Sequence, residues 1–227
     1  MKYQISGTVM PVVEVTLESQ EHLVAQPGAM KWKTGNVSMN TNMHGGLFKS
    51  IRRTFSGEDL FLVDFEANGV GSVTIGHSFP GTILPVEISQ GKNYICQKRA
   101  FLACSSDVDM DMYLQRKIGA GFFGGEGFVM QRLSGNGMAF VELDGEVTEI
   151  ELGPGESLQA ETGAVGMFEE TVSMNIEMVK GLGNLFFGGE GLFLTTLTGP
   201  GKIWLQSMPI QSMAKELIPF FPSTNKR

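Results

Sequence analysis

Three segments of this chain align in register, and this internal repeat limits the folds that the chain can adopt. The segments begin at Glu58, Glu126 and Glu190 and read EDLFLVDFEANG, EGFVMQRLSGNG and EGLFLTTLTGPG, without a gap. The match continues upstream through the tetrapeptides VSMN, VDMD and VSMN, with one short insertion in the first copy. Repeats of this kind indicate one structural unit used several times. The units span about residues 12–79, 83–143 and 147–208.

The polarity pattern inside each unit is typical of β-strands. Val13, Val15 and Leu17 alternate with polar residues, which is the period of a half-buried strand. Each aligned segment predicts a strand, a turn and a second strand, and no long helical periodicity is present. Equivalent apolar faces can share one core around a pseudo-threefold axis. The sequence therefore predicts a single all-β domain over residues 1–227, a three-fold pseudo-symmetric β-prism or barrel built from the three repeats.

The stretch FFGGEG occurs twice, at Phe122–Gly127 and Phe186–Gly191, and an altered copy, TFSGED, occupies Thr54–Asp59. One interpretation is a structural joint whose glycines supply positive φ or close backbone approach. The other is a loop that binds a ligand or partner through these candidate residues: Phe122, Phe123, Glu126, Phe186, Phe187 and Glu190. We favour the joint, because the same stretch recurs at one position of the repeat.

With this three-copy pattern, the paired FFGGEG stretches and the PGAM and TGAV turns, the chain resembles the altered-inheritance-of-mitochondria family and its bacterial relatives. The resemblance implies an all-β, prism-like fold grouped with the tryptophan RNA-binding attenuation protein-like folds, often assembled as an oligomer. It implies no catalytic activity, because mitochondrial members are tied to inner-membrane organisation without an established one. The chain lacks an Arg-rich amphipathic leader and so resembles a bacterial member.

Composition and sequence pattern argue against a nucleic-acid partner and against a secreted or membrane-spanning protein. The net charge is −7 and the pI is about 5.0, which disfavours nucleic-acid binding because that requires clustered Lys and Arg. Two cysteines, Cys96 and Cys104, form no disulfide framework and suggest a reducing compartment. The N-terminus carries no signal-peptide pattern, and no apolar run approaches the roughly 18–20 residues of a membrane span. We expect a cytoplasmic protein.

Two motifs suggest ligand chemistry, and each also has a structural explanation. GAGFFG at Gly119–Gly124 fits a dinucleotide-binding pattern, but that fingerprint requires a following helix, and the sequence predicts a strand there. DVDMD at Asp107–Asp111 places three carboxylates at alternate positions, which in a strand share one face and could hold Ca²⁺. A solvated polar strand face is the interpretation that we favour.

Candidate metal ligands and nucleophiles are scattered. His22, His44 and His77 stand in no metal-ligand spacing. Cys96 aligns with Ala25 and Ala160, which indicates a small buried position, whereas Lys98 and Arg99 keep a reactive thiol open as an alternative. We expect no catalytic residue, no cofactor and no metal.

The C-terminal tail, residues 209–227, departs from the repeat. Ser212 is a candidate cap for a short helix ending near Leu217, and IPFF follows, which we expect to dock on the core or on a neighbouring subunit. The sequence predicts a non-enzymatic β-scaffold that binds protein or assembles, as a homo-oligomer of three or more copies with an unknown protein partner. Membrane contact is disfavoured. A small-ligand or enzymatic pocket at the pseudo-threefold axis is the alternative, and RNA binding is a weaker one.

Overall fold

The structure is a computed structural model, and it describes residues 1–41, 62–116, 127–178, 193–217 and 220–221. The described residues form seventeen strands, two short 3-10 helices and one α-helix. The strands are β1 (Lys2–Ser6), β2 (Val12–Leu17), β3 (His22–Ala25), β4 (Met30–Asn40), β5 (Val63–Ile75), β6 (Gly81–Ile88), β7 (Tyr94–Gln97), β8 (Phe101–Ser105), β9 (Val108–Arg116), β10 (Phe128–Gly135), β11 (Gly137–Asp144), β12 (Val147–Leu152), β13 (Ser157–Glu161), β14 (Val165–Glu169), β15 (Ser173–Met178), β16 (Phe193–Thr198) and β17 (Gly201–Gln206). The helices are η1 (Lys98–Ala100), η2 (Thr162–Ala164) and α1 (Ile210–Leu217).

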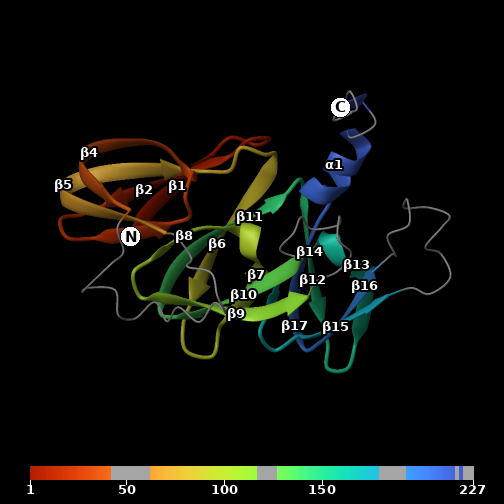
Figure 1. Cartoon of the computed structure of the whole chain (residues 1–227). Coiled ribbons are helices and arrows are strands. Elements are labelled where there is room, and N and C mark those ends of the chain that lie inside the picture. The colour runs from red at the N-terminus through yellow and green to blue at the C-terminus, as the bar shows by residue number, and fades with distance from the viewer. Residues whose placement is uncertain (42–61, 117–126, 179–192, 218–219, 222–227) are drawn as a thin grey trace.

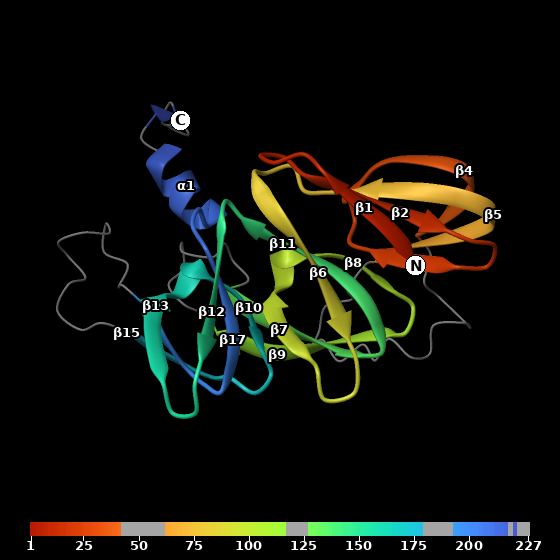
Figure 2. The same ribbon diagram turned by 180° about the vertical axis from the view of Figure 1, so that it is seen from behind.

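The strands form three sheets. The first has eight strands in the order β1-β2-β5-β3-β8-β11-β6, with β4 paired to β5 outside this path. The second has the order β12-β17-β14-β7-β10-β9, and the third is β13-β16-β15. The sheets curve around their interiors into a nearly closed, barrel-like body (Figures 1 and 2). The predicted all-β class is therefore confirmed, and the three-fold symmetry stays a prediction.

Alternating burial explains why the first predicted strand forms. Val13, Val15 and Leu17 of β2 are fully buried, as expected, and the residues between them face outward. Burying a side chain of this size stabilises the folded state by roughly 1.5–3 kcal/mol.

The strand–turn–strand prediction is correct for two of the three aligned segments. β10 is followed by β11, and β16 by β17, with a break at each turn. The first segment forms one long strand, β5, instead. The reason is that β4 pairs with β5 on both sides of the expected turn, as in Lys33 opposite Val73 and Met39 opposite Phe65.

The buried apolar side chains form three clusters instead of the single shared core that the repeat suggested. Two of the clusters combine residues of two successive segments, and the other combines residues of all three, from Val24 to Trp204. For example, Ile83 and Phe140 pack with the side chains of β2 and β5. The clusters thus join successive segments side by side.

Two strand pairs connect these segments, and they have matching registers. In the pair β3–β8, Val24 lies opposite Cys104. In the pair β7–β14, Ile95 lies opposite Phe168. In both cases a short strand pairs antiparallel with a strand of the next aligned segment of the chain.

The tail contains a helix, but the helix begins before the expected cap. α1 starts at Ile210, not after Ser212, because the Ile210 amide donates to Asp144 Oδ2 at 2.9 Å and the Ser212 amide donates to the Pro209 carbonyl. The helix ends at Leu217, as expected, and stands off the sheets (Figure 1).

Candidate functional site

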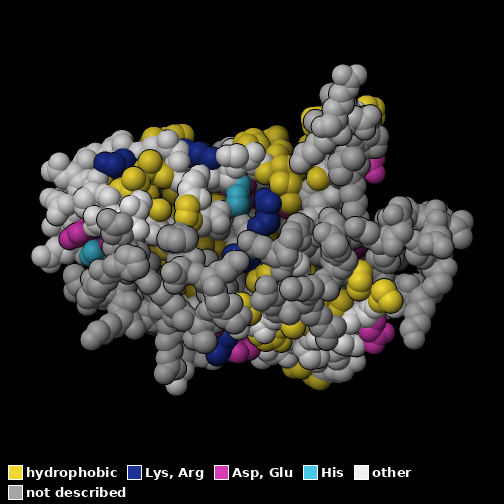
Figure 3. Space-filling model, in the orientation of Figure 1, with side chains coloured by type: hydrophobic (Ala, Val, Ile, Leu, Met, Phe, Trp, Pro, Cys, Tyr) yellow, Lys and Arg dark blue, Asp and Glu magenta, His cyan; other side chains and the backbone are white. Residues whose placement is uncertain are grey.

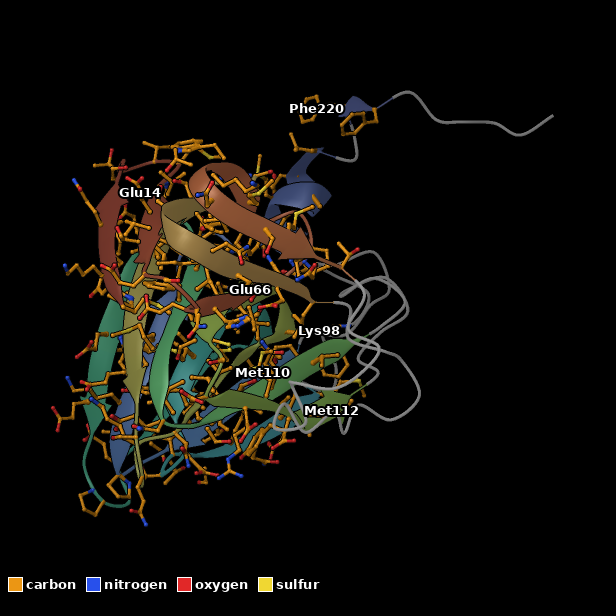
Figure 4. All side chains as sticks on the ribbon, turned by 90° about the vertical axis from the view of Figure 1, so that its left-hand side faces the viewer. Glu14, Glu66, Lys98, Met110, Met112 and Phe220 are labelled. Atoms are coloured by element: carbon orange, nitrogen blue, oxygen red, sulfur yellow. The ribbon has the colours of Figure 1, made fainter. Side chains whose placement is uncertain are left out.

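Of the two FFGGEG stretches, the structure describes only Gly127. The six candidate residues, Phe122, Phe123, Glu126, Phe186, Phe187 and Glu190, lie outside the described residues, as do Glu58 and the GAGFFG motif. Gly127 has a φ of +78°, a conformation that costs other L-residues energy. The backbone conformation at this position therefore favours glycine. The described strand ends that border residues 42–61, 117–126 and 179–192 lie on one side of the molecule (Figure 4).

A small cavity lies beside Gly127. Its volume is about 50 Å³, and it is lined by Gln97, Lys98, Arg99, Gly127, Phe128, Val129 and Gln211. This volume holds one or two water molecules, far below the roughly 300–1,000 Å³ of small-molecule sites. The described residues at this end of the glycine-rich stretch therefore offer no ready ligand pocket. As expected, the strand β10, not a helix, follows GAGFFG.

The two described histidines have separate structural partners. His22 Nδ1 lies 3.0 Å from Asp64 Oδ1, and burial raises the pKa of Asp64 while this contact partly opposes the rise. His77 Nε2 donates to the Arg99 carbonyl at 2.9 Å, and burial lowers the pKa of His77, so the ring is neutral near pH 7. His44 lies outside the described residues. Among the residues that the structure describes, no group of three or more His, Cys, Asp or Glu could hold a metal ion.

Glu142 is a buried carboxyl group with only one of its two oxygens hydrogen-bonded. Its side chain projects from β11 and is 3% exposed. Oε2 accepts the backbone N–H of His77 at 3.0 Å, whereas Oε1 is buried without a hydrogen-bond partner. Oε1 lies over Gly81, where an added Cβ would come within 2.9 Å of it. Burial raises the pKa of Glu142 to about 7, and the nearby charge of Asp144 adds to the rise.

Sequence reasoning missed Glu142, although the repeat carries a signal for it. Thr74, Glu142 and Gln206 stand at the same distance after the three anchor glutamates, and all three are buried. Both polar atoms of the Gln206 side chain have a partner, since Oε1 accepts the Asp144 amide and Nε2 donates to the Gly163 carbonyl. A carboxylate cannot donate in this way. The sequence thus shows a polar residue that recurs among apolar ones at this repeat position. It does not show that one oxygen of Glu142 lacks a partner.

Both cysteines are fully buried free thiols. Burial raises the pKa of Cys96 to about 12 and raises the pKa of Cys104 as well. A nucleophilic thiol requires the thiolate, which these surroundings disfavour. The prediction of a small buried position for Cys96 is confirmed, and the reactive-thiol alternative is wrong.

The DVDMD carboxylates do not share one strand face. Asp107 lies in the turn before β9, and its carbonyl accepts the Asn136 amide at 3.1 Å. Asp109 and Asp111 are half-buried in β9, and Met110 between them is fully buried. Because β9 begins only at Val108, the expected three-carboxylate face is reduced to two residues.

A larger groove lies at the start of β3. Its volume is about 430 Å³, and its lining includes Glu21, His22, Glu87, Ser105 and Asp107. The volume falls in the range of small-molecule sites, but such sites are mostly apolar, and this lining is rich in exposed carboxylates. The groove contains no buried polar atom without a partner among those that the structure describes. Its geometry therefore assigns no ligand.

The two most exposed large apolar side chains among the described residues lie near the C-terminus. Phe220 is 84% exposed and Phe221 is 68% exposed, beyond a helix whose Leu217 is also exposed. Figure 4 shows Phe220 at the tip of this projection, away from the sheets. The expected docking of the two phenylalanines on the chain's own core is therefore wrong for these described residues. Docking on a neighbouring subunit stays a prediction. Further hydrophobic side chains are visible along the upper part of the face in Figure 3.

The fold and these sites define an all-β protein with a barrel-like body and a projecting apolar tail. A family model described as mitochondrial biogenesis AIM24 matches residues 3–208. The chain belongs to this family, which confirms the resemblance read from its repeats. No helix among the described residues is long and apolar enough to cross a membrane.

Two relatives from Streptococcus pyogenes are similar over nearly their whole length. One, from a serotype M6 strain and described as uncharacterized, is 29% identical over 235 residues, covering 99% of this chain and 93% of the relative. The other is a crystal structure from structural genomics, with 27% identity and a TM-score of 0.78 over 97% of this chain and 99% of that chain. This likeness supports the fold.

Proposed function

We propose that this chain is a non-enzymatic β-scaffold that works through protein–protein contact and assembles as a homo-oligomer of three or more copies. The observation that carries the proposal is the exposed phenylalanine pair, Phe220 and Phe221, on the projecting tail. Exposed apolar groups of this size, gathered at one place, usually mark interfaces in soluble proteins, and large aromatic side chains are enriched in such contacts.

The titratable groups support a scaffold over an enzyme. The carboxylates with raised pKa values each have a structural role: Asp64 binds His22, Asp144 accepts the first amide of α1, and Glu142 accepts the His77 amide. None of these three contacts sets a Ser, Cys or Lys against the carboxylate in the manner of an activated nucleophile. We assign no catalytic role to any of them.

We also propose the three repeats, about 12–79, 83–143 and 147–208, as equivalent units with a pseudo-threefold, tryptophan RNA-binding attenuation protein-like arrangement. The matching registers of β3–β8 and β7–β14 support equivalence of successive units. The net charge of −7 supports a protein that avoids nucleic acid and anionic lipid surfaces. The two free cysteines support the proposed cytoplasmic location.

The alternative, a small-ligand pocket at the pseudo-threefold axis built from the FFGGEG stretches, has less support. The described cavity beside Gly127 is only about 50 Å³ in volume. We therefore keep the glycine-rich stretches as joints or partner loops and do not assign them a ligand.

Light scattering of the purified chain tests the proposal. We expect a mass of three or more chains of 24.7 kDa at micromolar concentration. A double Phe220→Ser, Phe221→Ser variant should dissociate at higher concentration than the parent, because it loses apolar surface that the contact buries. Val70→Ser is the matched control, since Val70 is 66% exposed but far along the chain from the tail. A parent mass of one chain, in low and high salt alike, would contradict the proposal.

A further inference from the structure

Two internal junctions of the molecule use the same strand register. β3 pairs with β8 so that Leu23, Val24 and Ala25 lie opposite Ser105, Cys104 and Ala103. β7 pairs with β14 so that Tyr94, Ile95 and Cys96 lie opposite Glu169, Phe168 and Met167. All of these residues except Ser105 and Glu169 are buried. In the repeat register, the residues of the second junction correspond one to one with those of the first.

In the repeat register, β13 and β4 correspond to the two strands that pair at each internal junction, but the structure does not pair them with each other. Ala25 and Cys96 correspond to Ala160 of β13, and Cys104 and Phe168 correspond to Lys33 of β4. Among the described residues, β13 pairs only with β16, and β4 pairs only with β5, so each keeps one free edge. Trp32 is 52% exposed and Gln159 is exposed, although the corresponding residues at both internal junctions are buried.

We propose that β4 of one copy of this chain pairs antiparallel with β13 of a second copy, with Lys33 opposite Gln159 and Trp32 opposite Ala160. Free strand edges present unpaired N–H and C=O groups and readily accept another strand. Pairing of this kind supplies main-chain hydrogen bonds together with alternate side-chain contacts. The inference rests on the proposed assembly and names a second surface, besides the phenylalanine pair, through which copies meet.

The two edges are complementary in charge and in shape. The proposed register places Lys31 opposite Glu161, an opposite-charge pair of the kind that stabilises adjacent strands. Trp32 would cover the small Ala160 and the half-buried Leu158. The exposed indole on β4 thereby gains a partner, whereas at the internal junctions its position is occupied by Ala103 and Met167.

A second copy fits these edges better than closure within one chain. β4 and β13 lie at opposite ends of the molecule in both views (Figures 1 and 2). Two different surfaces that join head to tail form a heterologous interface, which builds closed rings or filaments. Each added copy would continue the junction already made twice within the chain.

Disulfide trapping of the full chain tests the register. Lys33→Cys and Gln159→Cys change two exposed residues, and directly opposed residues of paired strands have Cα separations of about 4.5–5.5 Å, within disulfide range. The native cysteines are fully buried and do not compete. Under mild oxidation, a mixture of the two single variants should give a disulfide-linked dimer, and the double variant should give a ladder of larger multimers.

Lys33→Cys mixed with Ser157→Cys is the control, because Ser157 is exposed on the same strand face as Gln159 but two residues out of register. This mixture should link much less. If the double variant oxidises but remains one chain in mass, the third junction closes within the chain and the proposal is wrong. If light scattering shows an oligomer and no in-register linkage forms, the proposed edge pairing fails while the proposed assembly stands. A single-chain mass with no linkage overturns both.

Discussion

Glu142 is a carboxyl group held in surroundings that suit its protonated form. Its pKa is raised from 4.5 to about 7, first by burial and then by the charge of Asp144. Because the folded protein binds this proton more tightly than the unfolded chain, the stability associated with it is fully present below pH 4.5. It is lost as the pH rises from about 4.5 to about 7, and the loss approaches about 3 kcal/mol.

Glu142→Gln tests this assignment. The amide is neutral at every pH, and it can donate as Gln206 does at the corresponding position. We expect the variant to unfold at higher denaturant concentration than the parent at pH 8, with a smaller advantage at pH 5. Glu87→Gln on the facing strand β6 is the control, because Glu87 is exposed. An equal difference in stability between variant and parent at both pH values would show that the pKa of Glu142 is the same in the folded and the unfolded protein.

Residue burial could be read from the sequence where alternation was regular. Val13, Val15 and Leu17 are buried as their spacing predicted, and Cys96 is buried as its alignment with alanines predicted. The unpaired oxygen of Glu142 could not be predicted from the sequence. The hydrogen bonding of this carboxylate depends on the His77 amide, which the β5–β6 connection places beside it. The six residues of the FFGGEG hypothesis lie outside the described residues, so that hypothesis stays open.

Among the elements, α1 depends on a contact from a distant strand. It has eight residues, which is too short to be stable alone in water. Asp144 at the end of β11 accepts the Ile210 amide, one of the donors that a helix start leaves unpaired. The sequence predicted the helix from Ser212 as a candidate cap and from the following proline. It could not predict this capping contact, because Asp144 is distant along the chain.

Asp144→Ala should therefore loosen α1 without unfolding the sheets. Loss of a capping acceptor costs about 1 kcal/mol. The amides of Met213–Leu217 should then exchange with deuterium roughly five times faster, since 1.4 kcal/mol corresponds to a factor of ten. Asp144→Asn keeps a side-chain carbonyl and should stay close to the parent. Unchanged exchange in Asp144→Ala would mean that packing alone positions the helix.

The sequence predicted where strands form, but it did not predict which strands run on without a break. The turn expected near Gly69 does not interrupt β5, because β4 pairs with it along both halves. In the other two aligned segments, the facing strand is itself divided, as β8 and β9 or as β14 and β15. Continuity thus depends on the partner strand, which a single segment of sequence does not reveal.

For the whole molecule, the proposed repeat accounts for the barrel-like body and for the edges of β4 and β13 that no other described strand pairs with. Successive segments join through β3–β8 and β7–β14, and the series ends with β4 at one end and β13 at the other. The single core predicted from the repeat is replaced by three clusters, of which one combines residues of all three segments and the other two combine residues of successive segments. A chain built in this way has a natural route to assembly through the edges that its own segments leave unpaired.

Hydrogen exchange at several protein concentrations tests this central claim most directly. At concentrations where light scattering reports an oligomer, the amides of Trp32–Thr34 in β4 and Leu158–Ala160 in β13 should be slowed, and dilution should release them together. Leu23–Ala25 of β3, which are paired within the chain, should stay protected throughout. Fast, concentration-independent exchange of both edges beside a protected β3 would contradict the account.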